Sequence, residues 1–365
     1  MSPLQYQPLY LAILSVITCM IAWRFYTSPD DELSEKGQPN NIWICIPLCL
    51  VLVLWLGNRP VSSVFGDTFS YSHMYKNVRI AVINASMSGE WLFMWIIVWC
   101  RRAGLDVNGF FTVIDAIYIF TALLAVQKFV PKNPLLGMLF LCGSLMFFSY
   151  GTNGIRNGAA CSIVLLAMAF LLESNYIMAA VLAAVAMSLH RSVALPLASI
   201  VAARWIIRDP RHALYIWIGS IGLSLIGGNA FINFFSSLGF DDRMEAYGSK
   251  DAENYGFSST GFRWDFLLYS AMPVYLGYTV LIKHQVRDNW YRILYSTYCL
   301  ANAFWVLVIR AAFTNRFAYL SWFMYGIVVA YPLIMMRVWD DQDRRTAIIL
   351  LAFVGFTVIM NTLYW

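Results

Sequence analysis

The chain has 365 residues, of which 60% are hydrophobic and 12% are charged, and its formal net charge is +5. A soluble globular domain carries about twice that charged fraction, so soluble fold classes are excluded. The lysines and arginines are spread singly, without a basic tract, which excludes a nucleic-acid-binding surface. We therefore expect an integral protein of a cytoplasmic-type membrane.

The apolar segments predict helices. Runs of about 16 to 20 residues suit spanning helices better than the alternating segments of about 10 residues that form barrels. About twelve such runs occur, at 8–26, 42–57, 109–127, 135–150, 158–173, 176–190, 192–207, 213–228, 264–282, 293–309, 317–335 and 346–364. We expect an all-α polytopic membrane protein that forms one membrane domain over residues 1–365.

The stretch from Trp91 to Cys100 is different, because it has only about ten apolar residues between Glu90 and the pair Arg101-Arg102. It is too short to cross, and we expect an interfacial helix along the membrane surface. The loops of one side then hold thirteen of the 25 lysines and arginines. The positive-inside rule makes that side cytoplasmic. Both termini and the two long loops, 58–108 and 229–263, are expected to face the exterior.

Ionisable residues gather on the predicted exterior side. Such residues cost several kcal/mol at membrane depth unless they are paired or hydrated, so they are functional-site hypotheses. The candidates are Arg59, Asp67, Arg156, His190, Arg191, Arg263, Asp265, Arg310 and Arg316. The recurrence of arginine at one face suits a diphosphate, because guanidinium groups bind phosphate oxygens in pairs.

Simpler roles stay open for several of these residues. Arg156 and Arg191 could extend from helix ends to lipid headgroups. Asp67 could cap the helix that begins near Thr68, and His190 could be a satisfied interfacial histidine. Arg263 and Asp265 could pair with each other and anchor a loop.

The sequence lacks the motifs that mark several kinds of enzyme chemistry. The sequence has no Walker loop, dinucleotide-binding glycine pattern, HExxH or GxSxG. Its four histidines are scattered and its seven cysteines form no CxxC pair, so we expect no metal site. No cofactor is therefore expected.

Five short motifs follow one another along the chain. They are Gly66-Asp67-x-x-x-Tyr71, Gly154-Ile155-Arg156-Asn157-Gly158, Leu189-His190-Arg191-Ser192, Gly261-Phe262-Arg263-Trp264-Asp265 and Asn315-Arg316-Phe317-Ala318-Tyr319. In order and spacing this set resembles the EpsG family of Wzy-like O-antigen and exopolysaccharide polymerases, over most of the chain.

The resemblance implies a bacterial inner-membrane glycosyltransferase with a GT-C-like fold. It would transfer a glycan from undecaprenyl diphosphate onto the next lipid-linked repeat unit on the periplasmic side, and a chain-length regulator is a candidate partner. The family's functional positions fall on Asp67, Arg156, His190 and Arg316. We expect Asp67 to be the base, with His190 as its competitor. The predicted substrate-binding residues are Arg59, Tyr71, Arg156, Arg191, Arg263, Asp265, Arg310, Arg316 and Tyr319.

Alternatives remain from other classes. A flippase or transporter of lipid-linked oligosaccharide also needs a cationic cavity, but would tend to show inverted repeats and charges near mid-span. An O-antigen ligase differs from a polymerase only in its acceptor. An acyltransferase is disfavoured, because His73 is a poor match for the histidine such enzymes carry early in the chain.

Overall fold

A computed structural model describes residues 1–27, 41–227, 230–237, 261–311 and 314–364. Every regular element in these ranges is helical. The chain divides into two compact units: the first unit combines Met1–Val193 with Val329–Trp365, and the second unit is Ala194–Val328. Each unit is described by itself. The single membrane domain stays a prediction.

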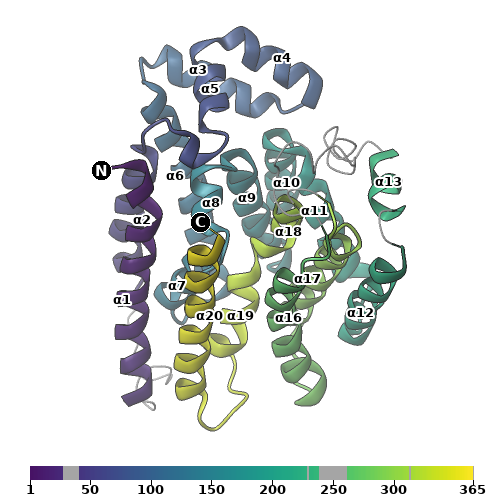
Figure 1. The fold of residues 1–365 in the computed structure, drawn as a ribbon. Helices are drawn as coiled ribbons and strands as arrows, with labels where there is room; N and C mark the ends of the chain where they lie inside the picture. The colour runs from purple at the N-terminus through teal and green to yellow at the C-terminus, as the bar shows by residue number, and fades with distance from the viewer. Residues whose placement is uncertain (28–40, 228–229, 238–260, 312–313, 365) are drawn as a thin grey trace. The chain divides into compact units, whose positions relative to one another are not determined.

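The first unit is built on long apolar helices (Figure 1). They are α1 (Tyr6–Thr27), α2 (Ile42–Gly57), α6 (Val107–Phe129), α9 (Ile155–Leu172), α10 (Tyr176–Leu189) and α20 (Gln342–Tyr364), with the shorter α7 (Pro134–Cys142) and α8 (Phe147–Thr152) between α6 and α9. Helix α9 packs against both α6 and α10, and α1 packs against α20. Helices α2 and α6 approach closely because Gly57 has no side chain: a Cβ there would lie 2.2 Å from Thr112 Oγ1.

Three short helices, α3 (Thr68–Lys76), α4 (Val78–Ser88) and α5 (Trp91–Arg102), connect α2 to α6. Figure 1 shows them gathered beyond the ends of α1 and α2. Helix α5 forms at the residues predicted for an interfacial helix. Its Trp91, Trp95 and Trp99 are exposed, whereas Phe93 and Ile97 are buried. Tryptophan is enriched where membrane meets water, which supports the predicted surface position of α5.

The second unit contains α11 (Ala194–Val201), α12 (Pro210–Gly227), α13 (Ala230–Ser237), α16 (Trp264–Gly277), α17 (Asn289–Leu307) and α18 (Thr314–Trp322). Helices α11 and α16 continue into π-helical turns at Ala202–Ile206 and Tyr278–Lys283. Helix α17 is central and packs against α11, α12, α16 and α18. Helix α19 (Tyr325–Met335) runs across the boundary of the two units.

A neutral hydrogen-bond network crosses the second unit, and we call it the Asn302 network. The Asn302 amide nitrogen donates to Ser270 Oγ at 3.2 Å and to Ser321 Oγ at 2.9 Å. Its oxygen accepts from Trp217 Nε1 at 2.7 Å, and Trp322 Nε1 donates to Ser270 Oγ at 2.7 Å. These bonds join α12, α16, α17 and α18 among buried or nearly buried side chains.

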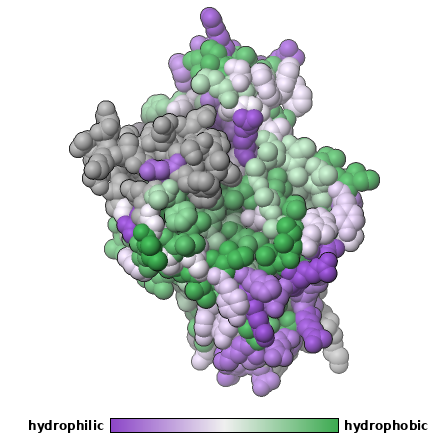
Figure 2. Space-filling model, turned by 90° about the vertical axis from the view of Figure 1, so that its right-hand side faces the viewer, coloured by the Kyte–Doolittle hydropathy of each residue, from purple (hydrophilic) through white to green (hydrophobic). Residues whose placement is uncertain are grey.

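The prediction of an all-helical, multi-pass membrane protein is confirmed. Within the described ranges, six helices are long and apolar enough to cross a membrane, at Pro3–Thr27, Val107–Phe129, Ile155–Leu172, Trp264–Lys283, Thr314–Met335 and Gln342–Leu363. Helices α2 and α10 are apolar but shorter. Figure 2 shows hydrophobic side chains gathered over the middle of one face and hydrophilic ones at its lower end.

The predicted number of about twelve membrane spans is not confirmed. The predicted span 135–150 is two short helices, α7 and α8, because the chain leaves helical conformation at residues 143–146. The predicted span 192–207 contains a π-helical turn. Of the predicted exterior loop 229–263, residue 229 and residues 238–260 lie outside the described residues.

Candidate functional site

A buried glutamate joins three segments of the first unit. Glu90 follows the last turn of α4 and is 5% exposed. Its Oε2 accepts a hydrogen bond from Arg156 Nη1 at 2.5 Å, and its Oε1 contacts Nδ1 of His190. The backbone N–H of Arg191 donates to the same Oε1 at 3.4 Å. We call Glu90, Arg156 and His190 the Glu90 cluster.

The turn before Glu90 depends on a glycine. Gly89 has a φ of +74°, a conformation that side-chain-bearing residues rarely adopt. A Cβ at Gly89 would lie 3.1 Å from the guanidinium carbon of Arg191. The glycine therefore aims Glu90 inward and leaves space for the Arg191 side chain, which is otherwise exposed.

The cluster holds Glu90 in its ionised form. Burial raises the pKa of Glu90, but the hydrogen bonds from His190 and the Arg191 backbone, the charge of Arg156 and the charge of His190 when protonated lower it below its ordinary value. A carboxylate can only accept hydrogen bonds, so the Nδ1 atom of His190 must carry the proton in their contact. In the neutral imidazole, Nε2 then has the free lone pair.

Arg156 occupies a buried position at the start of α9. Its Nη1 also donates to Asn84 Oδ1 at 3.1 Å, and its guanidinium lies 5.6 Å from the ring centre of Tyr71 and 5.3 Å from that of Phe93. Asp67 and Tyr71 both interact with it electrostatically. Its Nε is buried and has no hydrogen-bond partner among the described residues. The guanidinium thus keeps one donor that a ligand could use.

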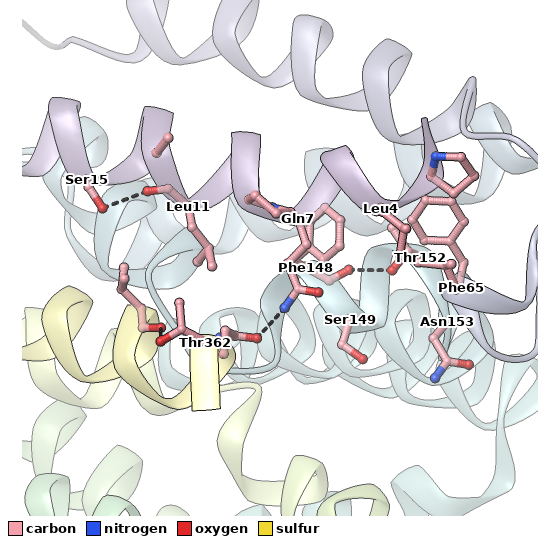
Figure 3. A pocket seen from close by; sticks show the side chains of 16 residues that line it. Leu4, Gln7, Leu11, Ser15, Phe65, Phe148, Ser149, Thr152, Asn153 and Thr362 are labelled. Carbon is pink, nitrogen blue, oxygen red and sulfur yellow. Dashed lines mark hydrogen bonds between the residues drawn. The ribbon is translucent and has the colours of Figure 1, made fainter. Parts of the chain in front are cut away.

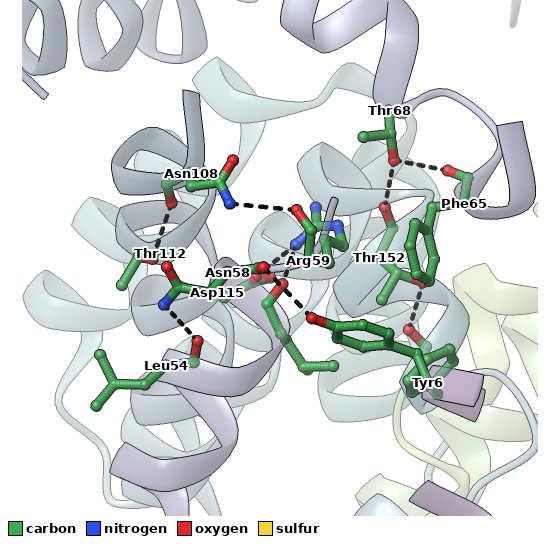
Figure 4. Close-up of polar contacts among 12 residues, drawn as sticks. Tyr6, Leu54, Asn58, Arg59, Phe65, Thr68, Asn108, Thr112, Asp115 and Thr152 are labelled. Atoms are coloured by element: carbon green, nitrogen blue, oxygen red, sulfur yellow. Dashed lines mark hydrogen bonds and ion pairs between the residues drawn. The ribbon is translucent and has the colours of Figure 1, made fainter. Parts of the chain in front are cut away.

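The loop that carries Asp67 is fixed by the segment before Arg156. The Asp67 backbone N–H donates to Asn153 Oδ1 at 2.8 Å. Gly66 has a φ of +53°, and a Cβ there would lie 2.4 Å from that same Asn153 oxygen. Thr68 Oγ1 donates to the carbonyls of Phe65 and Thr152 at 2.8 and 3.3 Å (Figure 4). The Gly66-Asp67 motif therefore docks on Thr152 and Asn153, directly before the Gly154-Ile155-Arg156 motif.

The two alternatives for Asp67 and Arg156 can be compared with this geometry. Asp67 precedes the first residue of α3 but makes no capping hydrogen bond with its side chain. Arg156 is 8% exposed and turned toward Glu90, which differs from an arginine that extends to headgroups. Neither observation matches the simpler role, and the roles of both residues in a site stay predictions.

Arg59 lies in a separate buried ion pair. Its Nη1 donates to Asp115 Oδ2 (Figure 4) and to the Leu56 carbonyl, both at 2.8 Å. Its guanidinium lies 4.4 Å from the ring centre of Phe111. The residue has no exposed surface. This geometry gives Arg59 a structural partner, and its contact with substrate stays a prediction.

The remaining candidates belong to the second unit. Arg263 forms a two-bond ion pair with Asp265, with Nε to Oδ1 at 2.9 Å and Nη2 to Oδ2 at 2.6 Å, as the simpler interpretation expected. Arg310 lies with its guanidinium 5.5 Å from the ring centre of Phe262. Arg316 and Tyr319 are both in α18. That these residues meet the Glu90 cluster in one vestibule stays a prediction.

Glu90 had no functional role in the sequence interpretation. One signal could have identified it, because Glu90 is one of three acidic residues in 58–108 and stands directly before an apolar helix. Asn84 and Asn153, which position Arg156 and Asp67, had no such signal. Across the described residues, no three His, Cys, Asp or Glu side chains form a group able to hold a metal ion.

Comparison with known proteins identifies the family. The family model described as EpsG matches residues 42–365, which include Glu90 and every predicted site residue. No curated protein and no solved structure matches the chain. The match covers most of the chain. The chain therefore belongs to the EpsG family, which indicates an exopolysaccharide-related polymerase.

Proposed function

We propose that the chain is a GT-C-like glycosyltransferase that polymerises a lipid-linked glycan on the periplasmic face of the bacterial inner membrane. Its substrate is an oligosaccharide linked to undecaprenyl diphosphate, and the acceptor is the next lipid-linked repeat unit. The observation that carries this proposal is the Glu90 carboxylate, which joins a buried arginine to a histidine beside the Asp67 loop.

The reaction is a single displacement. The acceptor hydroxyl oxygen forms a bond to the anomeric carbon of the donor glycan, and the bond from that carbon to the diphosphate oxygen breaks. Undecaprenyl diphosphate leaves with the electron pair, and the hydroxyl proton passes to a base. The anomeric configuration is inverted. The enzyme therefore needs one base and cations beside the leaving diphosphate.

His190 is the base in this proposal. Glu90 holds its Nδ1, so Nε2 can take the acceptor proton, and the side chain is 21% exposed. The carboxylate also stabilises the imidazolium that forms. General-base catalysis of this kind contributes about 10²–10⁴-fold. Asp67, placed by Asn153, orients the acceptor.

Arg156 and Arg191 supply the positive charge. Arg156 has an unpaired Nε, and Arg191 is exposed beside the backbone that binds Glu90. Fixed cations where charge develops give effects comparable to or larger than a base. Arg263, Arg310 and Arg316 are further candidate cations, and Tyr71 and Tyr319 are candidate sugar contacts. Arg156→Lys keeps the charge but loses the planar fork, and should lower the rate at least about tenfold.

The test uses purified protein and a synthetic undecaprenyl-diphosphate repeat unit, with products separated as a gel ladder. Wild type, His190→Ala, Asp67→Asn and the control Glu173→Gln are compared. Glu173 is a matched control because its carboxylate also forms an ion pair, with Lys128 at 2.7 Å, but is partly exposed.

We expect ladders from wild type and Glu173→Gln, none from His190→Ala and a weak one from Asp67→Asn. A ladder from His190→Ala with none from Asp67→Asn would instead assign the base to Asp67. Wild type that makes no ladder but moves the substrate across liposomes would be a flippase, and the proposal would be wrong.

A further inference from the structure

An elongated cavity runs beside the first helix of the first unit. Its volume is about 530 Å³, within the range of small-molecule sites. Its walls come from α1, α8 and α20 and from the loop before Asp67. Gln7 of α1 donates a hydrogen bond to Asn361 of α20, which holds two of these walls together.

One end of the cavity adjoins the loop that carries Asp67. Figure 3 shows Asn153 beside Phe65 and Leu4 at one end, and Ser15 at the other. Leu4 and Ser15 are separated by about 16 Å along the helix at about 1.5 Å per residue. Between them, Leu11 and Phe148 contribute to a mostly apolar lining. This shape suits a single hydrocarbon chain.

This end of the cavity is part of the candidate site. Asn153 lines the cavity and its side-chain oxygen also accepts the hydrogen bond from the backbone N–H of Asp67. Thr152 lines the cavity too, and its carbonyl accepts from Thr68. A molecule that fills the cavity therefore ends directly behind the loop that carries Asp67.

We propose that this cavity holds the isoprene units nearest the diphosphate in the lipid-linked substrate, with the diphosphate end toward Asp67. The inference rests on the proposed function for the identity of the lipid. Its basis is the apolar lining, the elongated shape and the continuity with the Asp67 loop. Helix α1 lies outside the matched residues 42–365, so this wall is a feature of the chain that the family match does not cover.

The experiment uses a photoactivatable isoprenyl phosphate with its reactive group in the tail, added to the full chain in phospholipid nanodiscs. Ala12→Trp fills the cavity from α1, and Ile13→Trp is its control, because Ile13 is the next residue, is 49% exposed and does not line the cavity. Thr362→Trp fills the cavity from α20, with Ile359→Trp as its control. Melting temperatures verify that each variant folds.

We expect labelling of α1 and α20 in wild type and in both controls, and at least a tenfold loss in Ala12→Trp and Thr362→Trp. Each excluded methylene is worth about fourfold in binding. Equal labelling by a phospholipid with a reactive acyl chain, uncompeted by isoprenyl phosphate, would overturn the proposal and assign the cavity to bulk lipid. Unchanged labelling in both filled variants would overturn it as well.

The labelling result is independent of polymerisation. If the filled variants lose labelling but wild type makes no ladder, the isoprenoid site is supported and the polymerase function is refuted. A normal ladder in the filled variants with long-tailed substrate would keep the polymerase and refute the site. When both hold, the filled variants should raise KM for long-tailed substrate at least tenfold, with little change for a short-tailed one.

Discussion

The Asn302 network of the second unit and the Glu90 cluster of the first both bury polar groups, but they satisfy them differently. In the network, the Asn302 amide nitrogen donates twice and its oxygen accepts from an indole, and every group is neutral. In the cluster, charged groups meet and the Nε of Arg156 is left without a hydrogen-bond partner among the described residues.

This difference suggests that the Asn302 network stabilises the fold and that the Glu90 cluster belongs to the proposed site. Neutral hydrogen bonds between helices in a membrane stabilise a bundle without leaving capacity for a ligand. Charged side chains are costly to bury, and the Glu90 cluster combines an unpaired arginine donor with a partly exposed histidine, which leaves capacity for another molecule. Changes in the cluster should therefore act on the reaction, and changes in the network should act on stability.

The largest effect is expected from Glu90→Gln. The substitution keeps the shape but removes the charge that fixes Nδ1 of His190 and neutralises Arg156. The polymerisation rate should fall about 10²–10⁴-fold, the size of a general-base contribution. Initial rates from the gel ladder measure this, with Glu173→Gln as the control. A normal polymerisation rate for Glu90→Gln would show that the Glu90 carboxylate takes no part in the reaction.

The buried pair of Arg59 and Asp115 provides the next test, because it is charged like the cluster but has no exposed surface. Arg59→Met leaves a buried carboxylate without its partner and should lower the free energy of unfolding by about 3–5 kcal/mol. The double variant Arg59→Met/Asp115→Leu should recover most of this loss. Unfolding in denaturant, with activity per folded molecule, measures both quantities.

The double variant also distinguishes the two roles of Arg59. A stable double variant with normal activity makes the pair structural. A stable but inactive one would support the substrate contact predicted from the sequence.

A smaller effect is expected from Asn302→Ala, because Trp217, Ser270 and Ser321 each lose a hydrogen bond to the Asn302 amide. The free energy of unfolding should fall by about 1–2 kcal/mol, as for other hydrogen bonds between membrane helices. Activity per folded molecule should stay near that of wild type. Thr279→Val removes an exposed hydroxyl of the same unit and is the control. Lost activity at unchanged stability would contradict the scaffold role.

The smallest effect is the response to acid. The pKa of Glu90 in the folded chain lies below its ordinary value of 4.5. Its stabilising contribution is therefore fully present above pH 4.5 and is lost as the pH falls through the lowered pKa. The melting temperature of wild type should fall more steeply between pH 5 and 3 than that of Glu90→Gln. Parallel curves would show that Glu90 is not stabilised as a carboxylate.

Long apolar runs predicted much of the fold. The run at 42–57 coincides with α2, because an uninterrupted apolar segment in a membrane has no other way to satisfy its backbone than a helix. The shorter apolar stretch from Trp91 to Cys100 lies within α5. Composition does not reveal where such a run bends. The break at 143–146 depends on packing, since a Cβ at Gly143 would lie 2.9 Å from Val354 of α20.

Two residues of the Glu90 cluster were among the residues predicted from the sequence. His190, Arg156 and Asp67 carry recognisable motifs, and the structure brings His190 and Arg156 onto one carboxylate. Glu90 was missed because a single acidic residue before a helix looks like any residue that starts one. Its function depends on two partners from other helices, and no local pattern contains them.

The contacts of Glu90 also constrain how the protein is made. Its partners Arg156 and His190 follow it by 66 and 100 residues. At about 5–20 residues per second, a ribosome needs roughly 5 to 20 seconds to reach the second of them. During that interval Glu90 has neither of these partners. Its ion pairs can form only after α9 and α10 have been synthesised, so the Glu90 cluster closes late in chain synthesis.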